Sequence, residues 1–112
     1  MEVRALASNQ PVAPRKVRLL LDMIEGRPVE EVIAMLGVLP QRSARLVQKT
    51  VRSAAANAEN NFGLDPDGLV VKRAIAGEAR TLKRFRARSR GRSSPRLRRY
   101  SHIEIVVEGE AY

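Results

Sequence analysis

Ten basic side chains lie between Arg80 and Arg99, and no acidic side chain interrupts them. Guanidinium and ammonium groups bind phosphates, and arginine does so through two parallel hydrogen bonds. The whole chain has 21 basic and 12 acidic residues, which leaves 11 basic and 12 acidic residues outside this segment. The net charge of +9 therefore belongs to one arm on a nearly neutral body, a pattern that predicts a polyanion partner. A solvated basic surface that only aids solubility is the alternative. The ten residues are Arg80, Lys83, Arg84, Arg86, Arg88, Arg90, Arg92, Arg96, Arg98 and Arg99.

The spacing of these cations favours an extended hairpin. Arginine occupies every second position from Arg84 to Arg92, which in a strand places the cations along one side of the backbone. Gly91 lies near the middle of the segment and suits a tight reversal. With about ten residues on each side, at roughly 3.3 Å per residue, the arm would reach about 30 Å from the body. A long, basic arm of this kind suits a folded RNA.

A second group of cations opens the first expected helix. Arg15, Lys16 and Arg18 lie in its first turn, where the helix dipole disfavours positive charge. A bound phosphate would reverse that effect, because free backbone amides and three cations would then converge on it. In the alternative interpretation, Asp22 and Glu25 pair with Arg18 and the cations near Lys16 on a solvated face.

A third group of cations lies along one face of the expected third helix. Arg42, Arg45, Lys49 and Arg52 are three or four positions apart and share one face, roughly opposite a face of alanine and valine. Such a stripe either grips a phosphate backbone or is an ordinary solvated face, and the sequence does not decide between the two.

Residues for catalysis are missing from the sequence. The one histidine, His102, begins a strand pattern and is best explained as a strand residue with a local hydrogen bond. Ser101 has no spaced base and acid, and there is no glycine-rich phosphate loop or dinucleotide fingerprint. The chain has no cysteine, and we expect no metal and no cofactor. Base-stacking side chains are few, so recognition should depend on backbone contacts and RNA shape. The aromatic residues are Phe62, Phe85, Tyr100 and Tyr112.

The elements that carry these side chains fit one domain of 112 residues, with the hairpin at about 77–101. We expect Gly26 and Gly37 to end the first two helices, since glycine adopts the left-handed backbone that follows many helices. The two strands that flank the arm should pair with each other in antiparallel fashion. The expected elements are a strand over 1–9, helices from Pro14 to about Glu25, from Pro28 to about Leu36 and from about Gln41 to Asn60, and strands over 69–76 and from about 101 to 108.

No apolar run approaches the roughly 20 residues of a membrane span, and the first residues lack the pattern of a signal peptide. Together with the absence of cysteine, this predicts a soluble intracellular protein.

Four motifs occur in this order along the chain: PRKVRLLLDMIEGRPVEEVIAML (Pro14–Leu36), SAAANAENN (Ser53–Asn61), LKRFRARSRGR (Leu82–Arg92) and YSHIEIVV (Tyr100–Val107). With these motifs, the chain resembles, over essentially its whole length, bacterial large-subunit ribosomal protein number twenty-two, a universal family of the polypeptide exit tunnel. Each motif alone is weak, and their joint occurrence in this order is what makes the resemblance specific.

The resemblance implies an α+β fold, with three helices packed on a small antiparallel β-sheet and one long protruding β-hairpin. It implies a cytoplasmic, non-enzymatic constituent of the large ribosomal subunit that binds 23S-type rRNA and supports its folding and assembly. Its partners would be that rRNA, neighbouring ribosomal proteins and the nascent polypeptide, with no membrane. We expect rRNA binding by Arg15, Lys16, Arg18, Lys49, Arg52, Arg80, Lys83, Arg84, Arg86, Arg96, Arg98 and Arg99. The hairpin tip in the exit tunnel would be Arg88, Ser89, Arg90, Gly91 and Arg92.

Two departures from the family pattern affect this expectation. Ala13 stands where the family often has a serine that caps the first helix, which costs about 1 kcal/mol of stability. Ala87 replaces a proline common before the tip, and Pro95 appears on the returning strand, so the bend of the hairpin is left open. The competing function is a free nucleic-acid-binding regulator or a DNA-architectural module, which would not sediment with large subunits.

Overall fold

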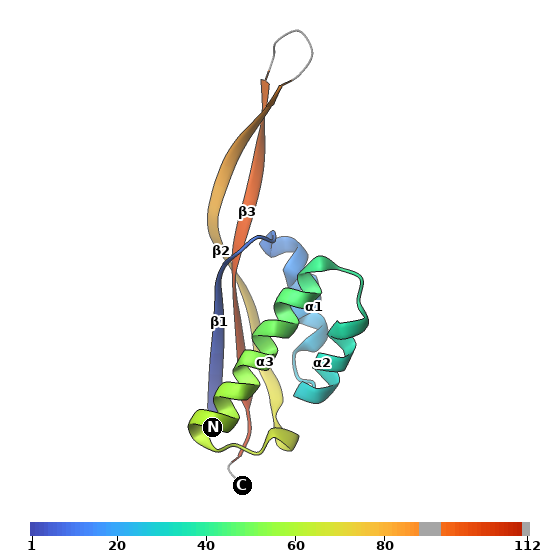
Figure 1. Ribbon diagram of the computed structural model, residues 1–112, viewed down its shortest axis with the longest axis vertical. Helices are drawn as coiled ribbons and strands as arrows, with labels where there is room; N and C mark the ends of the chain where they lie inside the picture. The colour runs from blue at the N-terminus through green and yellow to red at the C-terminus, as the bar shows by residue number, and fades with distance from the viewer. Residues whose placement is uncertain (88–92, 111–112) are drawn as a thin grey trace.

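The structure is a computed structural model that describes residues 1–87 and 93–110, and side chains in those ranges apart from residues 80–98. Three helices and three strands make up its regular structure, which confirms the expected α+β class (Figure 1). Met1 and the end of β3 lie side by side at the end of the body opposite the hairpin (Figure 1). The elements are β1 (Glu2–Gln10), α1 (Pro14–Ile24), α2 (Val29–Val38), α3 (Arg42–Phe62), a short 3-10 helix (Pro66–Gly68), β2 (Val70–Ala87) and β3 (Ser93–Glu108).

The three strands form one antiparallel sheet in the order β1-β3-β2. β3 lies in the middle, and β1 pairs with it only from Glu2↔Glu108 to Gln10↔Ser101. β2 and β3 remain paired beyond the body as far as Ala87↔Ser93, which makes the predicted hairpin (Figure 1). The extents of the molecule, 67 × 25 × 18 Å, reflect this long two-stranded extension.

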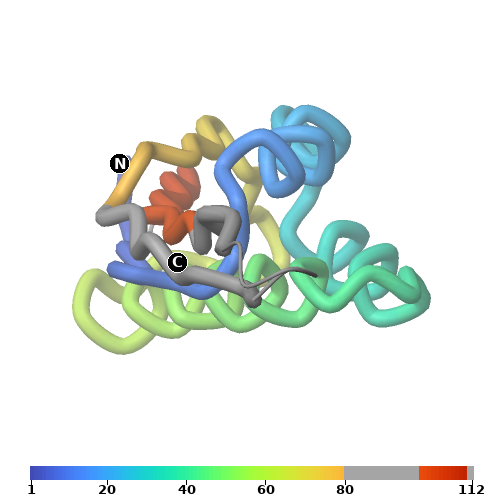
Figure 2. The backbone as a smooth tube through the Cα atoms, turned by 90° about the horizontal axis from the view of Figure 1, so that it is seen from above, coloured from blue at the N-terminus to red at the C-terminus, as the bar shows by residue number. Residues whose placement is uncertain are grey.

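The helices bury the apolar side of the sheet inside the body. Figure 2 shows α3 running beneath β1 and α1 beside β2, in agreement with the contacts between these elements. Alternate residues of the strands point into the core because successive side chains in a strand face opposite sides. Ala44, Ala54 and Ala58 of α3 are fully buried and allow the helix to approach the sheet closely. The core includes Val3, Ala5, Val71, Ile103, Ile105 and Val107 from the sheet, Val17, Leu20, Leu21 and Ile24 from α1, and Ala44, Val47, Val51, Ala54 and Ala58 from α3.

The connection between α1 and α2 covers the outer edge of β2 inside the body. The Gly26 N–H donates to the Val71 carbonyl at 2.7 Å, and the Val71 N–H donates to the Arg27 carbonyl at 3.0 Å. Gly26 has φ = +83°, so the left-handed glycine predicted after α1 is confirmed. These bonds satisfy edge groups that would otherwise attract another strand. β2 is therefore protected at its outer edge here, before it leaves the body as one arm of the hairpin.

The prediction that Gly37 ends the second helix was wrong, because α2 continues to Val38 with Gly37 inside it. A Cβ at Gly37 would lie 3.2 Å from Nε2 of Gln48 on α3, and this nitrogen donates to the Ile33 carbonyl at 2.8 Å. The glycine thus serves close packing of two helices. The third helix does end at a left-handed glycine, Gly63, with φ = +63°.

No helix in residues 1–87 and 93–110 combines the length and the apolar character needed to cross a membrane.

Candidate nucleic-acid interface

The register of the hairpin fixes how its basic positions lie relative to one another. Arg84 pairs with Arg96, and Arg98 pairs with Leu82, so two arginines occupy directly opposite positions in the two strands. Like charges at opposite positions destabilise a two-stranded ribbon unless counter-charges lie between them. Of the remaining predicted contacts, Arg80, Lys83 and Arg86 belong to β2. The predicted tip, Arg88, Ser89, Arg90, Gly91 and Arg92, lies outside the described residues.

A hollow of about 300 Å³ opens at the base of the hairpin, where β2 and β3 leave the body. It joins the start of α1 to a part of β3 that lies some 85 residues further along the chain, so the fold brings two groups of predicted cations together. Arg15 and Arg99 are both exposed at this hollow. Glu78 is the one carboxylate among its lining residues, which are Ala13, Pro14, Arg15, Arg18, Glu78, Ala79, Arg99 and Tyr100.

The start of α1 adds a positive helix end to this hollow. Ala13 is the N-cap residue, with φ = −72° and ψ = 134°, and no side chain caps the first turn. The first turn also contains no acidic residue. Within the described part of the chain, Arg15 and Lys16 make no hydrogen bond or ion pair. The local charge therefore remains positive, as the sequence predicted for an anion-binding helix start.

Arg18 has a second task that the sequence did not reveal. Its Nε and Nη2 donate to the Ala76 carbonyl at 3.3 and 3.0 Å, and this carbonyl lies on the open edge of β2. The guanidinium therefore ties α1 to the strand just before the hairpin begins. Arg18 remains exposed and has further N–H groups that are not used in these bonds. It therefore connects α1 to β2 and also contributes positive charge to the hollow.

The alternative that Asp22 and Glu25 neutralise these cations was wrong for Glu25. Its carboxylate accepts a hydrogen bond from the Ala74 N–H at 3.3 Å, again on the outer edge of β2. Among the described residues, neither acid forms an ion pair with Arg18 or Lys16. Glu25 and Arg18 instead satisfy a donor and an acceptor of the same strand edge, which leaves the helix start positively charged.

Ser101 and His102 fix the chain that leads into α1, and this role was also missed from the sequence. The Ser101 hydroxyl is fully buried and donates to the Val12 carbonyl at 2.5 Å. Nδ1 of His102 accepts from the Asn9 N–H at 3.2 Å, where β1 bulges and Asn9 adopts a positive φ of 51°. The expected hydrogen bond of His102 thus exists, but it joins residues 93 positions apart. These two hydrogen bonds attach the segment between β1 and α1 to the part of β3 at the hairpin base.

The cations of α3 are all exposed, but they do not join the hollow at the hairpin base. Lys49 lines a separate recess of about 170 Å³ between α3 and β1, and Arg42 lines a third recess beside α1. Arg45 and Arg52 make no ion pair within the described part of the chain. The structure therefore leaves the two interpretations of this stripe open.

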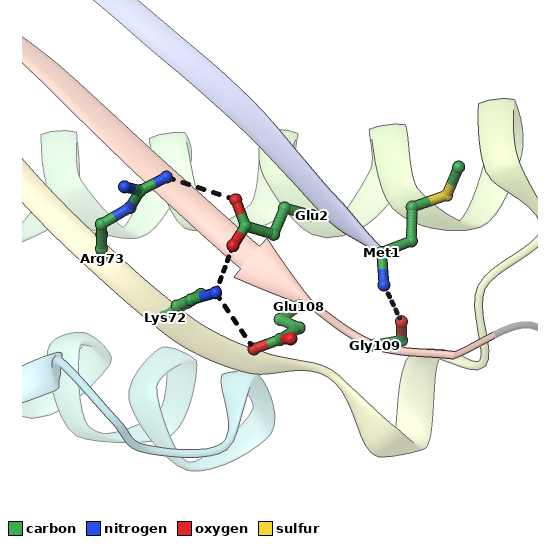
Figure 3. A network of polar contacts seen from close by, with 6 residues as sticks. All are labelled: Met1, Glu2, Lys72, Arg73, Glu108 and Gly109. Carbon is green, nitrogen blue, oxygen red and sulfur yellow. Dashed lines mark hydrogen bonds and ion pairs between the residues drawn. The ribbon is translucent and has the colours of Figure 1, made fainter.

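The opposite end of the sheet carries charges that are paired within the chain. Lys72 contacts the Glu2 carboxylate and lies 3.9 Å from Glu108, and Arg73 lies 3.2 Å from Glu2 (Figure 3). The hydrogen bond between Lys72 and Glu2 lowers the pKa of the Glu2 carboxyl and raises the pKa of the Lys72 ammonium. The Met1 ammonium donates to the Gly109 carbonyl at 3.0 Å beside this network (Figure 3). These charges are neutralised by one another and require no partner.

Fold and charge together define an α+β protein with a basic β-hairpin, in which unpaired cations gather where the hairpin joins the body. This is an arrangement for binding a polyanion. Residues 5–108 match the family model of ribosomal protein L22p/L17e, so the chain belongs to that family. It is accordingly a structural protein of the large ribosomal subunit and not an enzyme.

Proposed function

We propose that the chain binds 23S-type rRNA through its hairpin and the hollow at the hairpin base, and thereby supports folding and assembly of the large subunit. The proposal rests on the contrast between paired charges at one end of the sheet and unpaired cations at the other. Clustered arginines and lysines neutralise phosphates and release condensed counterions, which favours close approach of RNA segments that otherwise repel one another.

The hollow at the hairpin base is the most defined contact in this proposal. Arg15 lies in the uncapped first turn of α1 and Arg99 lies in β3, and both line this hollow. A phosphate there would be met by guanidinium groups and by the Arg15 backbone amide, since Pro14 has no N–H and the Lys16 N–H donates to the Ala13 carbonyl at 3.1 Å. Glu78 at the rim disfavours a second phosphate beside it. A single phosphate, or one sharp turn of an RNA backbone, is the ligand that fits.

The tip of the hairpin would line the exit tunnel and face the nascent polypeptide. The two strands are paired from Gly77↔His102 to Ala87↔Ser93, a span of roughly 33 Å at about 3.3 Å per residue. This length supports a division of labour in which the arms hold rRNA and the predicted tip, residues 88–92, reaches past it to the tunnel wall.

The test is a shortened hairpin that leaves the body intact. Lys83 and Leu97 are register partners, so replacing residues 84–96 with Asn-Gly closes the two strands with a two-residue turn. The variant should stay folded, because the buried core lies outside the deleted segment. Its affinity for large-subunit rRNA should fall, with a shallower dependence on salt, by roughly 0.7–0.9 in log–log slope for each phosphate that the hairpin no longer neutralises.

A full-length control separates charge from length. Changing the six arginines of residues 84–96 to glutamine should reduce the salt slope as much as the deletion does. Filter binding to rRNA over a range of KCl concentrations measures both variants, and circular dichroism checks their folding. An unchanged affinity and slope in the shortened protein would rule out the hairpin as the binding element.

A further inference from the structure

The recess lined by Arg42 lies between α1 and the start of α3. It shares only Ala13 with the hollow at the hairpin base. It has a volume of about 510 Å³. Its surface is formed mainly by apolar side chains, with polar groups contributed by both helices. The lining residues are Pro11, Val12, Ala13, Lys16, Leu19, Leu20, Met23, Gln41, Arg42 and Ser43. We call this recess the α1–α3 groove.

Two large apolar side chains of this groove are left open to solvent. Leu19 is 70% exposed and Met23 is 44% exposed, although the neighbouring turns of α1 bury Val17, Leu21 and Ile24 completely or nearly so. Lys16, Leu19 and Met23 are spaced i, i+3 and i+7, so they form a stripe beside the core-facing side of the helix. An apolar stripe next to a recess of this size marks an interaction surface more strongly than a solitary exposed residue does.

The rim of the groove is positive. Lys16 stands on one wall and Arg42 on the other, and the lining contains no carboxylate. The N-terminal end of α3, which has 21 residues, adds a positive dipole at Gln41, whose side chain caps no backbone amide. An occupant must therefore present an apolar group to the floor and negative charge to the rim.

We infer that the α1–α3 groove docks a segment of a neighbouring large-subunit protein, in which a large apolar side chain is flanked by aspartate or glutamate. The apolar side chain covers Leu19 and Met23, and the carboxylates reach Lys16 and Arg42. Methionine and leucine adapt to protein side chains of various shapes. The inference requires only that the chain is part of the large subunit, and it does not depend on the rRNA contacts proposed above.

RNA fits this groove less well than a protein segment does. Bases bind by stacking on aromatic rings or arginine planes, and the groove floor offers only aliphatic surface. Phosphates reaching the two rim cations would leave Leu19 and Met23 against a hydrated backbone, with no gain from burying them. A second copy of the chain is also disfavoured, since both copies carry a net charge of +9.

The test places a photo-crosslinker in the groove within the assembled particle. Benzoylphenylalanine replaces Leu19 in one variant and Met23 in another, and each variant is incorporated into purified large subunits before irradiation. Val38 is the matched control, because it is 81% exposed on α2 and does not line the groove. Mass spectrometry should find, from positions 19 and 23, the same ribosomal-protein peptide with an apolar residue beside carboxylates. The Val38 variant should not yield that peptide.

A synthetic copy of the crosslinked peptide then tests the chemistry on the free full-length chain. Lys16→Glu and Arg42→Glu should each weaken its binding, and Leu19→Ser should weaken it by at least about tenfold. Arg45→Glu is the control, since Arg45 is exposed on the same helix as Arg42 but does not line the groove. Crosslinks to rRNA or to a second copy, a peptide without carboxylates, or no crosslink from either position would overturn the inference.

Discussion

The two ends of the β-sheet carry charge in different ways. Where the strands end beside both chain termini, Glu2, Lys72, Arg73 and Glu108 neutralise one another (Figure 3). At the base of the hairpin, Arg15 and the start of α1 line a hollow in which Glu78 is the one carboxylate among the lining residues. The same side-chain types thus hold strands together at one end and remain available to a partner at the other.

This difference shows why net charge alone is a poor guide to a binding surface. Arg73 and Arg15 are equally basic and both are exposed, yet only Arg15 lacks a counter-charge among the described residues. Exposed ion pairs contribute little to stability, typically below about 1 kcal/mol, but they cancel the field that a polyanion would feel. Unpaired cations therefore locate the interface better than a count of basic residues does.

After the shortened hairpin, the largest expected effect comes from removing charge at the hairpin base. In the double variant Arg15→Gln/Arg99→Gln, the phosphate held in the hairpin-base hollow should no longer be neutralised, which weakens binding by roughly tenfold at about 0.1 M salt. Together with this loss of rRNA affinity, we expect the log–log salt slope to fall by roughly 0.7–0.9. Filter binding against KCl concentration measures both quantities.

The matched control for this variant is Arg27→Gln/Arg73→Gln. Arg27 lies 2.8 Å from Glu31, and Arg73 lies 3.2 Å from Glu2, so the same number of charges is removed from paired positions. The control should bind rRNA with nearly the wild-type affinity and slope. Equal losses in the two double variants would mean that total charge, and not its arrangement, governs binding.

Local patterns predicted most of the fold from the sequence. The helical faces, the left-handed glycine at Gly26 and the antiparallel hairpin depend on residues close in sequence, and all are present. Gly37 was misjudged because a glycine inside a helix is explained only by its neighbour in space, here Gln48 of α3. Such a contact leaves no local signal.

The site was predicted less completely because its geometry depends on distant parts of the chain. The cations of α1 and of the hairpin were both identified, but nothing in their spacing shows that Arg15 and Arg99 share one hollow. The hydrogen bonds of Arg18 to Ala76 and of Ser101 to Val12 join residues 58 and 89 positions apart. Only the folded sheet brings these groups together.

A smaller effect is expected from restoring the missing helix cap. Ala13→Ser supplies a hydroxyl that accepts from a backbone amide in the first turn of α1, which should raise the free energy of unfolding by about 1 kcal/mol. The same hydroxyl occupies an amide that our proposal assigns to a phosphate. Urea denaturation should therefore show a more stable protein, while rRNA affinity stays level or falls. A gain in both properties would contradict an anion at this helix start.

The smallest effect should come from the paired end of the sheet, in Glu2→Gln. Because the pKa of Glu2 is lowered in the folded protein, its contribution to stability is complete above its unfolded pKa, near pH 4. This contribution is lost as the pH falls through the lowered folded pKa. The raised pKa of Lys72 acts in the opposite direction, and its contribution is lost only as the pH rises above about 10.

Thermal unfolding of wild type and Glu2→Gln should accordingly differ by a small, constant amount between about pH 5 and 9, and should converge in acid. The difference should also shrink in 1 M NaCl, where screening over about 3 Å weakens exposed pairs. Binding of rRNA by Glu2→Gln should match that of wild type, since its carboxylate faces cations remote from the hairpin base. If Glu2→Gln altered the salt slope of rRNA binding, the freed Lys72 and Arg73 would be part of the interface, and the two ends of the sheet would not have separate roles.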